Sequence, residues 1–323
     1  MAAYIVRRLI WVIFLLFVVT LITFIVFSVL PAADPAVLRA GRQPSPELVA
    51  AIREQFGLSD PKIVQFFRYI GDILPFVGGD GVNFGYSFQS NQAVLPQIMD
   101  RLPVTIFLTT GAVIIWLSIS IPVGMISAVK TGSWLDRLSM GIALIFISAP
   151  VYFFGLVALY LFDDSIGKFP LLPGSGAYAD AHSVAGKAAA LIMPWFVLAA
   201  SFTAIYARFL RGNLIDTLQE DYIRTARAKG LSERRVIFRH GVRSAITPIV
   251  TLLGLDIGIL LGGAILTETV FNIPGIGRFA YEAIVRFDLP VIQGTVLFGA
   301  FFIVIMSLIV DILYAFIDPR VRY

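Results

Sequence analysis

The sequence predicts an all-α protein that crosses a membrane about six times. Of its 323 residues, 58% are hydrophobic and only 14% are charged, whereas a soluble domain usually carries about 25% charged residues. Long uncharged stretches recur along the chain, and basic residues gather in the segments on one side of the expected helices. The first two observations require a surface that faces lipid, and the third orients the helices in the bilayer.

The first apolar stretch, Leu9–Leu30, contains no charged residue. A helix of this length measures about 33 Å, which is enough to cross a hydrocarbon core of about 30 Å. The basic start of the chain resembles a signal peptide, but the apolar core of a signal peptide is shorter, about 7–15 residues. We therefore expect a retained membrane helix.

Five further apolar stretches complete the set: Val104–Val129, Leu138–Leu161, Ala188–Ala207, Ala245–Leu266 and Pro290–Phe316. Six spans put both termini on one side, and fifteen of the 25 Lys and Arg residues fall on that side. The positive-inside rule then predicts cytoplasmic N- and C-termini. We expect residues 1–95 to form the first helix and an extracytoplasmic segment. Residues 96–323 form the membrane core, with a cytoplasmic loop at 208–244.

The extracytoplasmic segment carries helix signals of its own. Ser45 is a suitable N-cap with a proline directly after it, which predicts a short helix over Pro46–Phe56 that Gly57 ends. A second, amphipathic helix is expected over Ile63–Leu74. These helices form either a small exposed cap or a docking surface for an extracytoplasmic partner, and composition does not choose between the two.

The cytoplasmic loop is rich in basic residues. A helix is predicted over Asp216–Lys229, with Gly230 at its C-terminal end and Ser232 as the N-cap of a second short helix. Attraction to anionic lipid explains basic charge alone, but it requires neither caps nor the small-residue face of Ala226, Ala228 and Gly230. A capped helix–turn–helix on this side is a candidate element for coupling to a partner, and four arginines stay available to carboxylates: Arg224, Arg227, Arg234 and Arg235.

At these residues the chain resembles a known family. The string Asp221–Leu231 is similar to the EAA motif of binding-protein-dependent ABC importer permeases, and more narrowly to the dipeptide, oligopeptide and nickel subfamily. Arg224-Thr225-Ala226 stands where the general motif has Glu-Ala-Ala. The resemblance covers nearly the whole chain and extends to four further stretches: Gln55–Leu58, Arg101–Thr105, Glu268–Arg278 and Asp318–Arg322.

The resemblance implies a B-type permease subunit with the type I ABC importer permease fold in the inner membrane of a prokaryote. Its partners would be a second homologous permease, two ABC ATPase subunits or domains, an extracytoplasmic substrate-binding protein and membrane lipid. The implied cargo is a di- or oligopeptide, with a nickel chelate, glutathione or haem as alternatives. The residues implied to contact the ATPase are Tyr222, Arg224, Thr225, Ala226, Arg227, Ala228, Lys229, Gly230 and Leu231, and those of the outer loop are Glu268, Asn272, Pro274, Gly275 and Gly277.

The chain lacks motifs for chemistry of its own. It has no G-x-x-x-x-G-K-[ST] phosphate loop, no H-E-x-x-H and no G-x-S-x-G. It has no cysteine, and its two histidines, His182 and His240, lie far apart. We therefore expect neither an enzyme nor a resident metal or cofactor, and no nucleic-acid partner. ATP and Mg would bind to the partner ATPase.

Two features lie inside the expected fifth span. Gly254, Gly258 and Gly262 share one face, which suits either packing within the chain or a seam against a second permease or the translocation path. A charge at the centre of a membrane costs about 2.5–3.5 kcal/mol, so Asp256 is a functional candidate. It either lines the path or forms a hydrogen bond to a neighbouring helix. Asp311, near the inner end of the sixth span, suits a structural role.

Three other classes of protein compete with this interpretation. An ion-coupled secondary transporter would use Asp256 or Asp311 as a proton relay, but no internal repeat is visible and the capped loop would have no purpose. The second class is a membrane enzyme, but the sequence lacks the catalytic motifs named above. A receptor or scaffold without transport is compatible with the composition, and only the resemblance of the loop argues against it.

Overall fold

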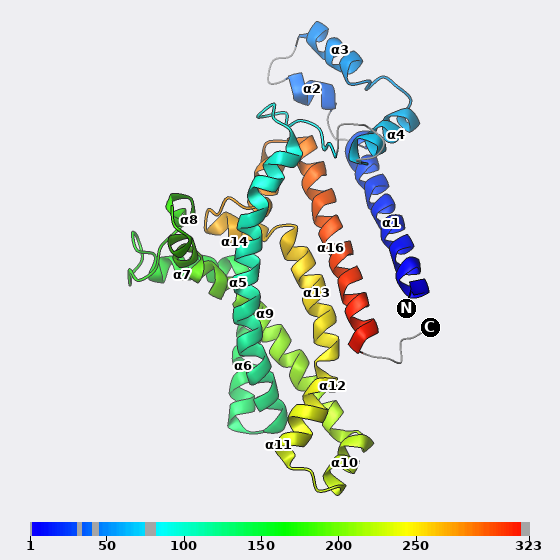
Figure 1. The fold of residues 1–323 in the computed structure, drawn as a ribbon. Helices are drawn as coiled ribbons and strands as arrows, with labels where there is room; N and C mark the ends of the chain where they lie inside the picture. Colours follow the sequence, from blue (N-terminus) through cyan, green and yellow to red (C-terminus); the bar gives the residue numbers. More distant parts are fainter. Residues whose placement is uncertain (1, 31–33, 41–44, 75–81, 318–323) are drawn as a thin grey trace. The chain divides into compact units, whose positions relative to one another are not determined.

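The computed structural model describes residues 2–30, 34–40, 45–74 and 82–317, and most of these residues are helical (Figure 1). Within those ranges there is no β-strand, and extended backbone pairs only at two isolated bridges. The predicted all-α class is therefore confirmed for the described part of the chain. The stretch Asp318–Arg322, named above for its resemblance, lies outside the described residues.

Among the described residues, four helices are long and apolar enough to cross a bilayer. Two bent helix pairs supply up to two more spans: one bends by 100° and the other, residues 233–245 with α13, by 45°. The prediction of about six spans agrees with this range of four to six. The four continuous helices are α1 (Ala2–Phe24, extended by the π-helical η1, Ile25–Val29), α5 (Val94–Val129), α9 (Val184–Gln219) and α16 (Leu289–Ile317).

The apolar stretch Leu138–Leu161 is not one straight helix, because the chain bends by 100° between α6 (Trp134–Ser148) and α7 (Val151–Phe162). Ala149 is extended, with φ −104° and ψ 143°. The ring of Pro150 disfavours helical backbone at the preceding residue, and proline offers no N–H to continue the ladder. A proline does not decide this alone, since α9 continues through one of its own.

The fifth apolar stretch also ends earlier than expected. The helix α13 (Thr247–Leu261) stops before Gly263, which has φ +127°, and α14 (Ile265–Val270) follows. A β-carbon at Gly263 would lie 2.4 Å from Cα of Gly277. Only glycine combines this backbone conformation with so close an approach, and the chain therefore turns here rather than continuing the helix.

The chain divides into two compact units, and the first comprises Met1–Thr105, Gly258–Ile265 and Gly275–Tyr323. Within it α1 packs along α16, and Arg8 forms an ion pair with Asp311. That pair agrees with the structural role expected for Asp311. Farther along α16, Gly262 approaches so closely that a β-carbon there would lie 2.9 Å from Cα of Gly299.

The part of the first unit predicted to be extracytoplasmic contains three short helices, α2 (Pro35–Ala40), α3 (Pro46–Gln55) and α4 (Lys62–Ile73). The two predicted helices are present with their predicted boundaries to within one or two residues. Ser45 Oγ accepts a hydrogen bond from Leu48 N at 3.2 Å, and the glycine after α3 has φ +59°. In α4, Phe66 packs against Phe24 of α1 with ring centroids 5.1 Å apart.

A buried carboxylate holds another part of the first unit together. Asp288 is 4% exposed and follows α15 (Ile276–Val285). It accepts hydrogen bonds from Ser87 Oγ at 2.5 Å and from Phe88 N at 2.9 Å. The segment that leads into α5 is thereby fixed to the turn before α16, and an apolar core in the same unit includes Val94 and Ile276.

The second unit comprises Ile106–Ile257 and Leu266–Pro274. Its helices α6, α7 and the short α8 (Ala177–Asp180) all pack against α9. From α5, Trp116 is fully buried and stacks on Phe202 of α9 with ring centroids 4.6 Å apart. A β-carbon at Gly124 would lie 2.8 Å from the carbonyl oxygen of Ala207. The long helix α9 is therefore the axis of this unit.

Candidate functional site

The predicted coupling element is an ordered substructure at the end of α9 (Figure 1). After α9 the chain forms α10 (Asp221–Ala228), α11 (Glu233–Arg235), the π-helical η2 (Val236–Val242) and α12 (Arg243–Ala245), and then enters α13. The elements belong to the second unit and contact one another and α9. We call residues 220–242 the coupling loop.

The single helix expected over Asp216–Lys229 is interrupted at Glu220, whose backbone is extended at φ −64° and ψ 150°. Its carbonyl oxygen accepts hydrogen bonds from the N–H groups of Ile223 and Arg224 at 3.0 and 3.2 Å, and so starts α10. The change of direction brings Ile223 into a small apolar cluster, which a straight continuation of α9 does not provide. Tertiary packing thus overrides the helical pattern.

The C-terminus of α10 closes as predicted around Gly230, which has φ +75°. The Gly230 N–H donates to Arg227 O at 2.9 Å, and the Leu231 N–H donates to Ala226 O at 3.4 Å. These two bonds form a Schellman motif, which satisfies carbonyl groups at the end of a helix and favours glycine at the left-handed position. The Ser232 side chain, expected as an N-cap, makes no capping bond, although its backbone is extended.

The loop has an apolar core of its own. Ile223, Ala226 and Val236 are buried, and Leu218 and Leu231 pack against them. Ala226 was predicted to belong to a small-residue face that approaches a partner, but it is only 7% exposed and faces this core. The other residues that were predicted to contact the ATPase differ in their exposure. Leu231 is half-buried, whereas the exposed ones are Tyr222, Arg224, Thr225, Arg227, Ala228, Lys229 and Gly230.

Charge pairs cross the turn of the loop. Arg227 Nη2 lies 2.7 Å from Glu233 Oε1, which joins α10 to α11, and this hydrogen bond raises the pKa of the guanidinium. Within α10, Arg224 Nη1 lies 3.3 Å from Asp221 Oδ1. Both pairs are largely exposed and each adds only about 0–1 kcal/mol of stability. The apolar core and the Schellman motif therefore contribute more to the shape of the loop.

The loop is held against α9 by a close helix contact. A β-carbon at Gly241 of η2 would lie 3.2 Å from side-chain atoms of both Leu214 and Leu218 in α9. The absence of a side chain lets η2 lie directly on the last turns of α9. The chain continues from η2 through α12 into α13. This contact therefore holds the segment that leads into α13 against α9.

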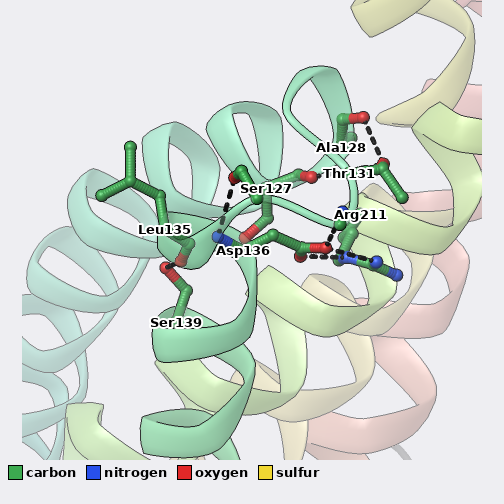
Figure 2. A network of polar contacts seen from close by, with 9 residues as sticks. Ser127, Ala128, Thr131, Leu135, Asp136, Ser139 and Arg211 are labelled. Atoms are coloured by element: carbon green, nitrogen blue, oxygen red, sulfur yellow. Dashed lines mark hydrogen bonds and ion pairs between the residues drawn. The ribbon is translucent and has the colours of Figure 1, made fainter.

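The end of α9 is also attached to the turn between α5 and α6 by a buried ion pair, shown in Figure 2. Arg211 donates to both carboxylate oxygens of Asp136, at 2.6 and 2.8 Å, and the Gly132 N–H donates to the same carboxylate at 2.8 Å. The side chain of Asp136 is 5% exposed and that of Arg211 is 25% exposed. A bidentate pair of this kind fixes orientation as well as distance.

The intramembrane candidates occupy different surroundings. Gly258 packs against α16 of the same chain, since a β-carbon there would lie 2.9 Å from Cα of Ile303, and Gly262 meets Gly299 of that helix. Gly254 is buried. Asp256 accepts a hydrogen bond from the Tyr206 hydroxyl at 2.5 Å. The two glycines thus have a packing role within the chain, and the carboxylate has a partner on α9.

Most of the predicted outer-loop residues are buried or half-buried. Glu268 and Gly277 are buried, and the main-chain N–H of Ile273 donates to Glu268 O at 2.8 Å. Asn272 is exposed and left-handed at φ +54°, a conformation that asparagine tolerates better than most residues. Pro274 is half-buried, and Gly275 is the N-cap of α15.

Sequence reasoning missed four residues that organise these regions: Asp136, Arg211, Tyr206 and Asp288. Only Asp136 carried a local signal, because it follows Ser133 and Gly132 at the start of a helix and suits a first-turn acid. The others act through partners that are distant in the chain. Sequence spacing does not reveal such partners.

The sequence comparisons bear on the chain as a whole. The family described as binding-protein-dependent transport system inner membrane component matches residues 120–323, and the family of its N-terminal part matches residues 1–109. The chain belongs to this permease family. Its members are membrane permeases rather than enzymes, and the protein is therefore a multi-pass inner membrane protein with the type I permease fold.

Similar permeases match along their entire length. The chain is 39% identical over 323 residues to the glutathione transport system permease protein GsiC of Salmonella paratyphi A, and equally to GsiC of Escherichia coli K12. It is 37% identical over 340 residues to the dipeptide transport system permease protein DppB of Alkalihalophilus pseudofirmus. In each case the match covers 100% of both chains.

Proposed function

We propose that this permease is one of the two membrane subunits of an ATP-driven importer of di- and oligopeptides. We also propose that the coupling loop is the part that the ATPase subunits move. The observation that carries the proposal is the construction of the loop. It has its own buried core and a Schellman-capped turn, yet Tyr222, Ala228 and Gly230 remain exposed on it. Attraction to lipid does not require a preformed surface of this kind, whereas docking to a protein groove benefits from one.

In this proposal two ATPase subunits bind ATP and Mg and dock on the exposed face of α10. Closure of the ATPases moves the coupling loop, and α9 and α13 carry the motion into the membrane. A second homologous permease completes the path, and an extracytoplasmic substrate-binding protein delivers the cargo. Residues 1–95 supply the first helix and the extracytoplasmic segment, residues 96–323 supply the core, and both termini lie in the cytoplasm of a prokaryote.

The substrate class follows from the names of the relatives. DppB is named for dipeptides and GsiC for glutathione, a small molecule that itself contains peptide bonds. Both cargoes are short, polar chains, and we therefore propose a peptide as the transported solute. Glutathione is the second candidate because it is named for relatives 39% identical to this chain. A nickel chelate and haem are the further alternatives within the subfamily that the sequence resembles.

The test is reconstitution of the permease with ABC ATPase subunits and a second permease from the same organism. Proteoliposomes receive the substrate-binding protein and labelled dipeptide or glutathione on the extracytoplasmic side, and ATP on the other. The proposal expects uptake of one of these solutes only when ATP is hydrolysed. Uptake driven by an ion gradient without ATP would instead establish a secondary transporter, and isolation of a permease that moves solute without any ATPase would also refute the proposal.

A further inference from the structure

The two helices that flank the coupling loop are joined at a second place, deep in the second unit. Tyr206 of α9 donates its hydroxyl hydrogen to Asp256 Oδ2 of α13 at 2.5 Å. Tyr206 is only 1% exposed, and its ring lies against Trp116 with centroids 5.8 Å apart. Trp116 in turn stacks on Phe202, one turn earlier in α9. The hydroxyl is therefore held in place by aromatic packing on its own helix and on α5.

The Tyr206–Asp256 pair lies at a distance from the coupling loop along both helices. Tyr206 precedes the end of α9 at Gln219 by about 20 Å, and Asp256 follows the start of α13 at Thr247 by about 14 Å, at 1.5 Å rise per residue. Nearer the loop, Gly241 rests on Leu214. Among the described residues, η2 and α12 contact α9 beside the loop, and the Tyr206–Asp256 hydrogen bond joins α9 to α13 about two turns of α9 farther from the loop.

We infer that Tyr206 and Asp256 form a latch that makes α9, the coupling loop and α13 move as one lever, and that Asp256 serves coupling rather than contact with the solute. Two helices joined at one point can pivot about that contact, whereas two separate contacts remove this freedom. A carboxylate inside a membrane is costly when it has no hydrogen-bond donor, so loss of this bond is unfavourable. This inference rests on the proposed function, because a lever needs a motion to transmit.

The latch and a solute-path role for Asp256 make opposite predictions for conservative variants. Asparagine in place of Asp256 keeps a carbonyl oxygen that can accept from Tyr206 but removes the charge. Phenylalanine in place of Tyr206 keeps the ring but removes the donor. If the latch operates, Asp256→Asn retains coupling and Tyr206→Phe loses it. If the charge contacts the solute, Asp256→Asn loses import and Tyr206→Phe has little effect.

The experiment measures solute imported per ATP hydrolysed in proteoliposomes that hold the whole transporter. We expect import per ATP to fall about tenfold or more in Tyr206→Phe and in Asp256→Leu, since a hydrogen bond to a charged group contributes roughly that factor to an equilibrium. Asp256→Asn should remain near the unmodified ratio. The double variant Tyr206→Phe with Asp256→Leu leaves no charge at position 256, and it should be no worse than either single change because only one bond is lost.

The amount of assembled transporter in the membrane is the control for folding in every variant. Equal coupling in all four variants would refute the latch and leave the pair as packing alone. A defect in every variant that replaces Asp256, with normal coupling in Tyr206→Phe, would also refute it, in favour of a solute contact. Failure of the unmodified transporter to couple import to ATP would refute the proposed function instead, so the two failures are distinguishable.

Discussion

Gly230 offers the sharpest test of the coupling loop. Its φ of +75° is a conformation that costs a residue with a side chain about 1–2 kcal/mol, equivalent to a factor of about 5–30 in a local equilibrium. Nothing lies within 4 Å of a β-carbon built at this position, so a new side chain would project from the exposed surface without a clash inside the chain. Gly230→Ala therefore measures backbone strain alone, and Gly230→Glu adds a charged side chain on the proposed docking face.

Gly132 provides a matched control. It has φ +80°, is exposed and also has nothing within 4 Å of a built β-carbon, but it lies in the turn between α5 and α6. Gly132→Glu thus imposes the same strain and the same charge outside the coupling loop. We expect import per ATP to fall in the order unmodified, Gly230→Ala, Gly230→Glu, and Gly132→Glu to resemble Gly230→Ala or better.

The assay is ATP-driven uptake of labelled dipeptide or glutathione in proteoliposomes, with ATP hydrolysis measured in the same sample. Retention of the ATPase subunits during purification in mild detergent reports docking directly. If Gly230→Glu couples as well as Gly230→Ala and retains the ATPases equally, Gly230 does not lie on the docking face. If Gly132→Glu is as defective as Gly230→Glu, the effect is a general consequence of charge on the cytoplasmic side.

Three further predictions concern stability and packing. Asp136→Ala should lower the free energy of unfolding by about 3–5 kcal/mol because it leaves Arg211 without its buried partner; thermal unfolding in detergent checks this, and an unchanged midpoint would contradict it. Ala226→Trp should overpack the core of the loop and lower its stability by about 1–3 kcal/mol, which makes the loop more sensitive to protease. Ala228→Trp, on the exposed side, should leave protease resistance of the loop intact. Equal protease sensitivity of the two variants would show that the core is not buried as described. The Arg53 guanidinium of α3 lowers the pKa of Asp34, the residue before α2, below its usual value. Their ion pair should therefore stabilise this region above the ordinary carboxyl range and be lost as pH falls through the lowered pKa. Hydrogen-exchange protection factors in α2, corrected for the intrinsic pH dependence of exchange, should fall on acidification, and unchanged protection factors would refute the prediction.

Local rules in the sequence were sufficient for several elements. Ser45 and Gly57 delimit α3 as predicted, because a capping hydroxyl and a left-handed glycine act within a few residues of each other. Gly230 ends α10 for the same reason. The bend at Pro150 follows from a local rule as well, yet α9 continues through Pro194. A proline therefore marks a candidate break, and the packing around it decides whether the helix continues.

Other features of the site depend on partners far away in the chain. The helical pattern runs through Glu220, but burial of Ile223 against Val236 redirects the chain there. The same burial turns Ala226 inward on the face that it shares with Ile223 and leaves Ala228 exposed. Sequence patterns report the tendency of a segment, whereas the direction of each face is set by the element that packs against it.

The sequence by itself determined that this chain is a membrane-spanning helical protein, that its basic loop is capped, and that it resembles a permease family. Each of these follows from composition, from residues within one helical turn of each other, or from a nearly continuous motif. Only the tertiary structure decided which loop residues are exposed and that Tyr206 meets Asp256 across 50 positions of the chain. Contacts of this kind arise from the packing of whole helices, and no local interaction specifies them.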